Sequence, residues 1–531
     1  MEKDESAQTG QEGAVVKKSG GLLKSTAVVS VMTMLSRVLG LVRDVTIANM
    51  FGAGSGADAF FVAFKIPNFF RRLFAEGAFN QAFVPVLSEY RAKRDHAAVK
   101  QLVAETSGTL AGILLVITVL IVLAAPWVAW IFAPGFAQDA DKFALAGEML
   151  RITFPYLFLV SLTAFAGSVL NSYGKFAVPA FTPVLLNITL ISSAILLAPM
   201  MDTPVMALAW AVMMAGVLQL IFQIPFMKQL DLLTAPKWGW HSEGVSQIRK
   251  LMIPALFGVS VGQLNLLLDT ILASLLEDGS VSWLYYSDRL MELPLGVFGI
   301  AIATVILPSL SRKHASDSPE AFSATLDWAV RMVLLIGVPA ALALAILAQP
   351  LLVTLFQYGE FGIRDVEKAT LSLQAYALGL LGFMLVKVLV PGYFARQDTK
   401  TPVSIGIKAM VANMVFNLLL IVPLAHAGLA LATTLSAFLN ACLLFIGLRK
   451  EGVYHKTPGW MPFLVRLLLA NVTLVAVILW LNPDAPTWLG WGWWERSLQM
   501  AMLVVEGVAA YFACLFLGGM RKQHLLAGRA G

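Results

Sequence analysis

The sequence predicts an all-α integral membrane protein of about 14 transmembrane helices, in two six-helix pseudo-symmetric lobes plus a C-terminal helix pair. Three observations predict this fold class: an apolar composition, regularly spaced apolar stretches, and a repeat that relates the two halves of the chain. The chain is 58% hydrophobic and 13% charged, whereas soluble domains are about 45–50% apolar and about 25% charged. Its mean hydropathy of +0.77 is typical of a membrane protein.

Apolar stretches of roughly 20 residues, long enough to cross a hydrocarbon core of about 30 Å, recur from Leu22 onward with short polar gaps. The residues before them are polar and lack the apolar core and cleavage site of a secretory signal. We therefore expect disordered cytoplasmic tails over residues 1–21 and 521–531. Cys442 and Cys514 lie far apart in apolar spans, so the sequence predicts neither a disulfide framework nor a cysteine metal site.

The net charge of +6 indicates membrane orientation and not nucleic-acid binding, because the basic residues lie in alternate connections between spans. The connections that we assign to the cytoplasm carry Arg91, Lys100, Lys228, Lys237, Arg312, Arg396 and Arg449. The connections on the opposite side are poor in Lys and Arg and carry Asp139, Asp202, Glu277, Glu360 and Asp484. This pattern predicts that both termini are cytoplasmic.

The two halves of the chain resemble each other at a shift of roughly 220–225 residues, as in transporters built from internal repeats. The shift aligns Asp44 with Asp269, Gly54 with Gly279, Pro85 with Pro308, Pro179 with Pro402 and Gln219 with Asn440. The repeat predicts an N-lobe over 22–229 (helices 1–6) and a C-lobe over 244–450 (helices 7–12). Because each lobe has an even number of helices, both have the same orientation and enclose a central cavity. Residues 460–520 form a helix pair outside the repeat.

Ionisable residues inside spans cost about 2.5–3.5 kcal/mol each on insertion scales, so they usually face a cavity or a partner. In this chain they concentrate in the first, second and eighth spans. Assuming 3.6 residues per turn, Asp58, Lys65, Arg72 and Glu76 share one face of the second span, which Pro67 and Gly77 interrupt. The first span carries Arg37 and Arg43, whereas the seventh has Gly262 and Leu268 at the aligned positions.

This asymmetric positive charge predicts an anionic substrate, because Arg and Lys together suit a phosphate or pyrophosphate. The structural alternative is that these residues form ion pairs or extend to the membrane surface from the ends of the spans. In the eighth span, Asp288 and Glu292 are placed to neutralise Arg289 or to hold basic side chains of the facing lobe. The residues that we expect at the substrate site are Arg37, Arg43, Asp58, Lys65, Arg71, Arg72, Glu76, Ser282, Asp288, Arg289 and Glu292.

Two other kinds of site were weighed against the sequence. "GVSVG" at residues 258–262 matches a nucleophile elbow but lies in an apolar span. All six histidines are assigned to loops or tails. We therefore expect neither an enzyme nor a buried histidine proton relay. Oxygen ligands for a hard cation are available in the seventh, eleventh and twelfth spans, from Asp269, Asn413, Asn417 and Thr433. The alternative for these residues is ordinary polar contact between helices.

Four segments carry a resemblance to a known family: "SRVLGLVRD", "DAFFVAFKIPNFFRRLFAEGAFNQAFVPVLSEY", "VSWLYYSDRLMELPLGVFGIAIATVILPSLS" and "QDTKTPV". They resemble the MurJ (MviN) family of the MOP exporter superfamily, over nearly the whole chain after the polar tail. The resemblance implies two lobes around a V-shaped cavity, with the final helix pair forming a groove for a lipid tail. It also implies that Arg37, Arg43 and Arg71 meet a pyrophosphate, with Asp58 and Lys65 in the same cavity.

The family resemblance implies a flippase that moves lipid II, the undecaprenyl-pyrophosphate-linked peptidoglycan precursor, from the cytoplasmic to the periplasmic leaflet by alternating access. It places the protein in the bacterial inner membrane with a role in cell-wall synthesis and cell shape. The expected partners are lipid II, membrane lipids and other cell-wall synthesis proteins, without nucleic acid. No cofactor is expected, and the energy source is a coupling cation or the membrane potential. The alternatives are a MATE-like cation-coupled drug exporter and a non-transporting cell-wall scaffold.

Overall fold

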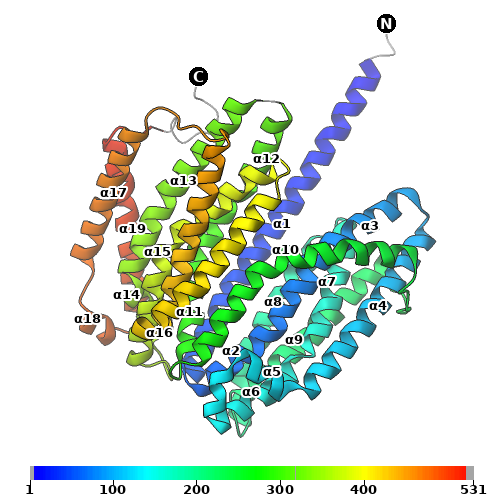
Figure 1. Cartoon of the computed structure of the whole chain (residues 1–531), viewed down its shortest axis with the longest axis horizontal. Helices are drawn as coiled ribbons and strands as arrows, with labels where there is room; N and C mark the ends of the chain where they lie inside the picture. Colours follow the sequence, from blue (N-terminus) through cyan, green and yellow to red (C-terminus); the bar gives the residue numbers. More distant parts are fainter. Residues whose placement is uncertain (1–4, 317, 522–531) are drawn as a thin grey trace. The chain divides into compact units, whose positions relative to one another are not determined.

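The computed structural model describes the backbone of residues 5–316 and 318–521, and the side chains of these residues apart from 5–26, 74–76, 257–262, 300–301 and 303–304. Every regular element in these ranges is a helix, and no strand occurs among them (Figure 1). The predicted all-α class is therefore confirmed.

The described helices form two compact units, and each is described here by itself. Unit 1 comprises Met1–Met50 and Ala59–Gln263, and unit 2 comprises Phe51–Asp58 and Leu264–Gly531. These limits differ from the predicted lobes, because residues 51–58 group with the second half and residues 244–263 with the first. The lobe boundaries derive from the repeat and not from packing, so they stay a prediction.

Unit 1 contains most of α1 (Glu5–Phe51) and α2 (Ser55–Phe70), followed by the π-helix η1 (Arg71–Ala78). Its other elements are α3 (Phe79–Lys93), α4 (His96–Leu123), α5 (Ala125–Phe132), η2 (Pro134–Gln138), α6 (Ala140–Thr153), α7 (Tyr156–Ser172), α8 (Ala177–Ser192), η3 (Ser193–Leu197), η4 (Ala198–Met200), α9 (Met206–Gln229) and the first part of α10 (Glu243–Ser274). Helix α9 packs against α7 and α8. The core includes Phe79, Phe83 and Phe165, whose rings lie 5.1–6.1 Å apart.

Unit 2 is built around α15 (Ile363–Phe394), which packs against α11 (Ser280–Pro294), α13 (Pro319–Ile346) and α16 (Lys400–Lys450). Ala425 has φ 47° and ψ −129°, so it divides α16 into two helical stretches. The final helices α17 (Trp460–Leu481) and α19 (Trp493–Leu517) pack against each other. The remaining elements are η5 (Leu295–Gly299), α12 (Ile300–Ala315), α14 (Ala348–Phe356) and α18 (Ala485–Gly490).

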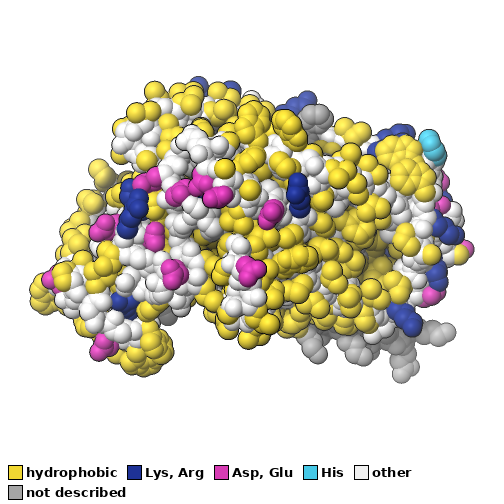
Figure 2. Space-filling view, turned by 90° about the horizontal axis from the view of Figure 1, so that it is seen from below, with side chains coloured by type: hydrophobic (Ala, Val, Ile, Leu, Met, Phe, Trp, Pro, Cys, Tyr) yellow, Lys and Arg dark blue, Asp and Glu magenta, His cyan; other side chains and the backbone are white. Residues whose placement is uncertain are grey.

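Nine helical stretches in the described part are long and apolar enough to cross a membrane. Large apolar side chains such as Leu123, Trp127 and Val422 are at least 73% exposed, and Figure 2 shows hydrophobic side chains over much of the visible surface. A soluble monomer rarely exposes apolar surface of this extent. The chain is therefore a membrane protein with multiple spans, although the count of about 14 stays a prediction.

The tail prediction differs from the structure at the N-terminus. Helix α1 begins at Glu5, so residues 5–21, which we expected to be disordered, have helical backbone. The segment contains Glu, Gln, Ala and Lys, which all have high helix propensity. A polar composition therefore does not argue against a helix. At the other end, residues 522–531 lie outside the described part.

Candidate functional site

Five of the predicted basic residues belong to unit 1. Arg37 and Arg43 lie on α1, Lys65 lies on α2, and Arg71 and Arg72 begin η1. Their exposure differs: Arg43 is buried, Arg37 and Arg71 are half-buried, and Lys65 and Arg72 are exposed. Among the described residues, no side-chain hydrogen bond or ion pair is found for Arg37. Unit 1 thus carries the larger part of the predicted positive charge.

Arg43 is held by two polar side chains inside unit 1. Its Nε and Nη2 atoms donate to Oδ1 of Asp44 at 2.9 and 2.7 Å, and its Nη1 donates to Oδ1 of Asn187 on α8 at 3.0 Å. Asn187 in turn donates from Nδ2 to the Ser36 carbonyl at 3.0 Å. The guanidinium therefore links α1 to α8. Sequence reasoning did not single out Asn187, although an Asn inside an apolar span is a recognisable signal.

The second predicted span changes its helical geometry where the charges gather. The chain is α-helical only to Phe70 and continues as a π-helix from Arg71, after Pro67, which cannot donate to the carbonyl four residues earlier. A π-helix has more residues per turn than an α-helix, so the 3.6-residue argument for a shared face does not extend to Arg72. Arg71 is oriented locally, because its Nε donates to Oδ1 of Asn68 at 3.0 Å. The side chain of Glu76 lies outside the described residues.

Asp58 caps the N-terminus of α11 within unit 2. Its carboxylate accepts hydrogen bonds from the Gly279 and Ser282 backbone N–H groups at 2.8 and 2.9 Å, and from Oγ of Ser282 at 2.7 Å. Asp58 is 1% exposed, and a carboxylate at a helix N-terminus is stabilised by the helix dipole. In the same unit, Ser55 donates to Asp278 at 2.6 Å. The beginnings of α2 and α11 are therefore joined by two polar contacts.

The acidic residues of α11 include the partner of its arginine. Nη1 of Arg289 lies 2.9 Å from Oε2 of Glu292, and the guanidinium lies over the Tyr285 ring, 5.1 Å from its centroid. Asp288 is half-buried on the same helix. The structure thus pairs Glu292 with Arg289, which is one of the two roles that the sequence left open, and the acidic residues of this helix outnumber its one arginine.

The four residues of the predicted cation site come together in unit 2. Nδ2 of Asn417 donates to Oδ1 of Asp269 at 2.7 Å and to Oδ1 of Asn413 at 2.9 Å. Oγ1 of Thr433 lies 3.3 Å from Oδ2 of Asp269 and 3.4 Å from Nδ2 of Asn413. Asn413 and Asn417 are fully buried.

The donor set of this cluster fits a hard cation. Oδ1 of Asn417 and Oδ1 of Asn265 are buried without a hydrogen-bond partner among the described residues, and buried orphan acceptors need an explanation. Carboxylate, carboxamide and hydroxyl oxygens are the ligands that hard cations prefer. A single carboxylate balances one positive charge, which favours a monovalent ion, because a divalent ion would leave net charge in a low-dielectric interior.

The prediction that every histidine lies in a loop or tail is wrong for His426. It lies in α16 directly after the kink at Ala425 and is 2% exposed. Its Nε2 lies 2.9 Å from the Lys368 carbonyl, and its ring lies 5.0 Å from that of Trp283. Pro423 and Gly428 on either side of His426 are typical of a loop, whereas the kink lets the chain continue as a helix with this side chain inside.

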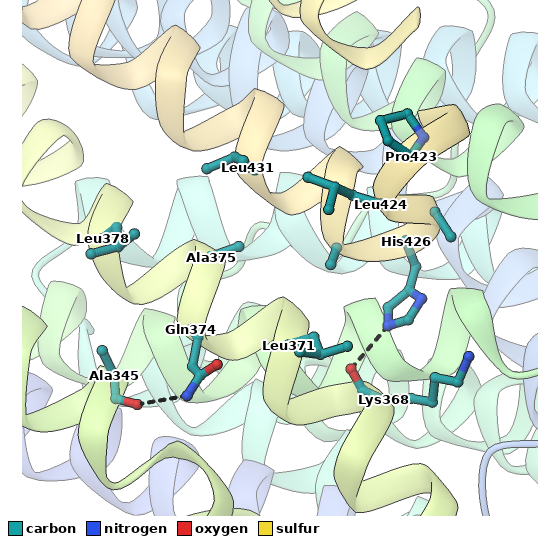
Figure 3. A pocket seen from close by; sticks show the side chains of 12 residues that line it. Ala345, Lys368, Leu371, Gln374, Ala375, Leu378, Pro423, Leu424, His426 and Leu431 are labelled. Atoms are coloured by element: carbon teal, nitrogen blue, oxygen red, sulfur yellow. Dashed lines mark hydrogen bonds between the residues drawn. The ribbon is translucent and has the colours of Figure 1, made fainter. Parts of the chain in front are cut away.

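His426 also borders a hollow of about 540 Å³ between α15 and α16 (Figure 3). The other lining residues are mostly apolar, including Leu371, Leu378 and Leu431. None of the predicted substrate residues lines it. Lys368, which lines it, and Arg364 pair with Glu277, and the hydrogen bond from Lys368 lowers the pKa of Glu277. We therefore do not assign this hollow to the anionic substrate.

Two buried charges that sequence reasoning missed fix the C-terminal helix pair. Arg496 on α19 is 4% exposed and donates to four carbonyls, two near the end of α14 (Val353 and Gln357) and two in α18 (Trp488 and Leu489). Asp327 on α13 accepts hydrogen bonds from Tyr454 and Trp460 and lies 3.0 Å from Nε of Arg331. Both are charged residues within or beside apolar helices, which is a usable signal.

The fold is similar to that of solved membrane transporters. The chain superposes on a structure described as an inward-facing multidrug resistance MATE family transporter of the MOP superfamily, with a TM-score of 0.65 at 14% identity, over 80% of this chain and 97% of that one. It superposes more closely on one described as lipid II flippase MurJ in an inward closed conformation, with a TM-score of 0.77 at 23% identity, over 92% and 98% of the chains. At these identities the likeness shows the fold alone.

Sequence comparison identifies the family of this chain. The family model described as "Lipid II flippase MurJ" matches residues 47–489. A probable lipid II flippase MurJ of Haemophilus influenzae is 54% identical over 508 residues, covering 93% of this chain and 99% of that protein. The lipid II flippase MurJ of Burkholderia cenocepacia is 44% identical over 95% of this chain and 98% of that protein. The chain belongs to the MurJ family.

Proposed function

We propose that this chain is a lipid II flippase that moves its substrate from the cytoplasmic to the periplasmic leaflet of the bacterial inner membrane. The observation that carries the proposal is the 54% identity to a probable lipid II flippase over 93% of the chain. The positive-inside pattern supports cytoplasmic termini. Peptidoglycan synthesis and cell shape depend on this step, because the precursor must reach the outer leaflet.

The basic residues of unit 1 support binding of the pyrophosphate. Arg37, Arg43 and Arg71 offer guanidinium groups, which pair with phosphate oxygens in a bidentate manner. Lys65 and Arg72 add two further charges nearby in sequence. A pyrophosphate loses its hydration when it enters a low-dielectric cavity, and these groups would replace it. The role is binding and release, with no covalent chemistry by the protein.

Asp58 and Ser282 support a gate on the periplasmic side. Their hydrogen bonds hold the start of α11 against the start of α2, at the end of these helices that the charge pattern assigns to the periplasm. A contact of this kind stabilises one conformation of a two-state transporter, and a substrate that binds the other state more tightly shifts the equilibrium. Glu292, Asp288 and Arg289 on α11 belong to the same moving helix.

The energy source is proposed to include a monovalent cation at Asp269, Asn413, Asn417 and Thr433. The orphan oxygen of Asn417 supports this site. An inside-negative potential would also favour outward movement of an anion, by about 2.3 kcal/mol per charge per 100 mV. A cation that binds one conformation better than the other would bias the cycle.

The test is a depletion strain complemented with single variants. Loss of the protein should leave the lipid-linked precursor inaccessible to an externally added enzyme that cleaves it, and the wild-type gene should restore access. Arg37→Ala, Arg43→Ala and Arg71→Ala should fail to restore it at normal membrane levels. Arg94→Ala is the control, because Arg94 pairs with Glu243 on the exposed surface of unit 1. External access that persists after depletion would refute the flippase assignment.

The same experiment addresses the alternatives. A drug exporter of the MATE type shares only the fold at 14% identity, and its loss would change drug resistance while precursor access stayed normal. If the protein were a scaffold without transport activity, the arginine variants would still complement the depletion strain.

A further inference from the structure

Glu506 places a carboxylate in the middle of the last helix of unit 2. Helix α19 begins with the exposed Trp493 and Trp494, and the exposed Arg521 follows its other end. Aromatic and basic side chains of this kind mark the two membrane–water interfaces. Glu506 lies 13 residues after Trp493 and 15 before Arg521, which is about 20 Å from each interface at about 1.5 Å per residue. The carboxylate therefore lies close to the middle of the hydrocarbon core.

The Glu506 side chain lies outside the face by which α19 packs. Within unit 2, α19 contacts α13, α14 and α17, and α17 and α19 run side by side at an edge of the unit (Figure 1). The buried residues of α19 share one face of the helix: Arg496, Met500, Leu503, Gly507, Tyr511 and Leu515. At about 100° per residue, Glu506 lies roughly 110° from the centre of this face, and its side chain is exposed. The described part of the chain offers it no hydrogen bond or ion pair.

The same side of α19 carries a second polar side chain without a partner. Gln499 lies two helical turns before Glu506 and is half-buried, and its side chain has no hydrogen bond to any described residue. The exposed Met502, Ala509 and Ala513 complete this side of the helix. Successive members of the set are three or four residues apart, as in a seam between packed helices, and the two alanines let another backbone approach closely. We call these five residues the Glu506 stripe.

Charge indicates which occupant fits the Glu506 stripe. A carboxylate at this depth is stabilised by a donor on a neighbouring helix, and a cationic donor gives the stronger bond. The lipid headgroups lie at the ends of the span, about 20 Å away. A second copy that paired through the same stripe would oppose two carboxylates, which repel each other in a medium of low dielectric constant. The basic residue within α19, Arg496, is buried and already donates to four carbonyls.

We propose that the Glu506 stripe is a docking surface for a transmembrane helix of another membrane protein, one that carries a lysine or arginine near the middle of its span. The basic group pairs with the Glu506 carboxylate, and a polar group two turns away meets the Gln499 amide. None of the five residues belongs to the proposed pyrophosphate, gate or cation sites. The surface is therefore distinct from the residues assigned to transport.

The first test measures whether Glu506 recognises a basic transmembrane helix. The probe is a labelled Leu/Ala peptide of about 23 residues with one central lysine, compared with the same peptide carrying leucine there. Each peptide is titrated against the labelled full-length chain in dioleoylphosphatidylcholine vesicles, with Förster transfer as the readout. Wild type should bind the lysine peptide about 5-fold to 30-fold more tightly than the leucine peptide. Glu506→Gln should keep part of this preference, and Glu506→Leu should lose it. An equal preference in wild type and Glu506→Leu overturns the proposal.

The second test asks whether the stripe, and not any carboxylate on α19, forms the surface. Val508 is 47% exposed and lies two residues after Glu506, on another side of the helix at nearly the same depth. Glu506→Leu combined with Val508→Glu should not regain the preference for the lysine peptide. Full recovery of the preference in this variant overturns the assignment of the surface to the stripe.

Two outcomes identify the other occupants. Photobleaching steps of the full-length chain in the same vesicles should show monomers. Dimers that are lost in Glu506→Leu overturn the proposal in favour of a second copy. If wild type binds the two peptides equally, Glu506 faces lipid without a partner helix, and the proposal is overturned as well.

Discussion

Removal of the Asp58 carboxylate should weaken the contact between the starts of α2 and α11. Asp58→Ala leaves the N–H groups of Gly279 and Ser282 without their acceptor, at about 1–3 kcal/mol for each buried donor. Because water can reach part of the opened site, we expect a net cost of about 2–4 kcal/mol, which corresponds to about 30-fold to 900-fold in the equilibrium. Ser282→Ala removes only the Oγ bond and should cost about 0.5–1.5 kcal/mol.

A cysteine pair reports this contact directly. Ser55 and Asp278, whose side-chain oxygens lie 2.6 Å apart, are replaced by cysteine in a chain in which Cys442 and Cys514 have been changed to alanine. The rate of oxidative cross-linking should fall in the order parent, Ser282→Ala, Asp58→Asn, Asp58→Ala. All variants share the same cysteine pair, so its own effect cancels. Equal cross-linking rates in the parent and Asp58→Ala would refute the claim that Asp58 holds the start of α11 against the start of α2.

Three further predictions follow from other described contacts. Arg496→Met should lower the free energy of unfolding by about 2–5 kcal/mol, because four buried carbonyls lose their donor. Arg496→Lys should recover part of this free energy, and an unchanged Tm in Arg496→Met would contradict the prediction. Gly108→Ala should speed trypsin cleavage after Lys237, because its Cβ would lie 2.2 Å from the Lys237 carbonyl oxygen, whereas Gly406→Ala meets nothing within 4 Å and is the control. Glu277→Gln should destabilise by less than about 1 kcal/mol. Because the folded-state pKa of Glu277 is lowered from 4.5, its contribution to the stability of the fold is present above pH 4.5 and is lost as the pH falls through the folded-state pKa. A Tm difference between Glu277→Gln and wild type that persists at lower pH would contradict this.

The all-α class was predictable because composition and span length depend on the bilayer and not on details of packing. The meeting of Asp269 with Asn417 was also predictable, since polar residues buried in apolar spans have few partners to choose from. The π-helix at Arg71 was not, because Pro67 predicts a disturbance but not the hydrogen-bond pattern that replaces the helix.

His426 shows why local turn signals mislead in this chain. The residue lies near Pro423 and Gly428, which are typical of a turn. The structure instead uses a non-helical residue, Ala425, to redirect the chain, and packing against Trp283 buries the imidazole. Such burial depends on which helices meet, information that periodicity within one helix does not contain. Arg496 was missed for the same reason, because its acceptors are backbone carbonyls of α14 and α18. A pattern of side chains does not predict such contacts.

Arg37 offers a way to separate function from stability. Arg43 is compensated by Asp44 and Asn187, whereas the described residues provide Arg37 with no hydrogen bond or ion pair. A charge in a span costs about 2.5–3.5 kcal/mol on insertion scales, and groups kept for binding an absent ligand commonly reduce stability. Arg37→Leu should therefore raise the Tm of the substrate-free protein and abolish precursor export. Arg43→Leu should instead lower the Tm, because it removes the buried ion pair between Arg43 and Asp44. Thermal unfolding of the purified variants measures both effects, and a lower Tm for Arg37→Leu would show that Arg37 supports the fold and is not held in reserve for an anion.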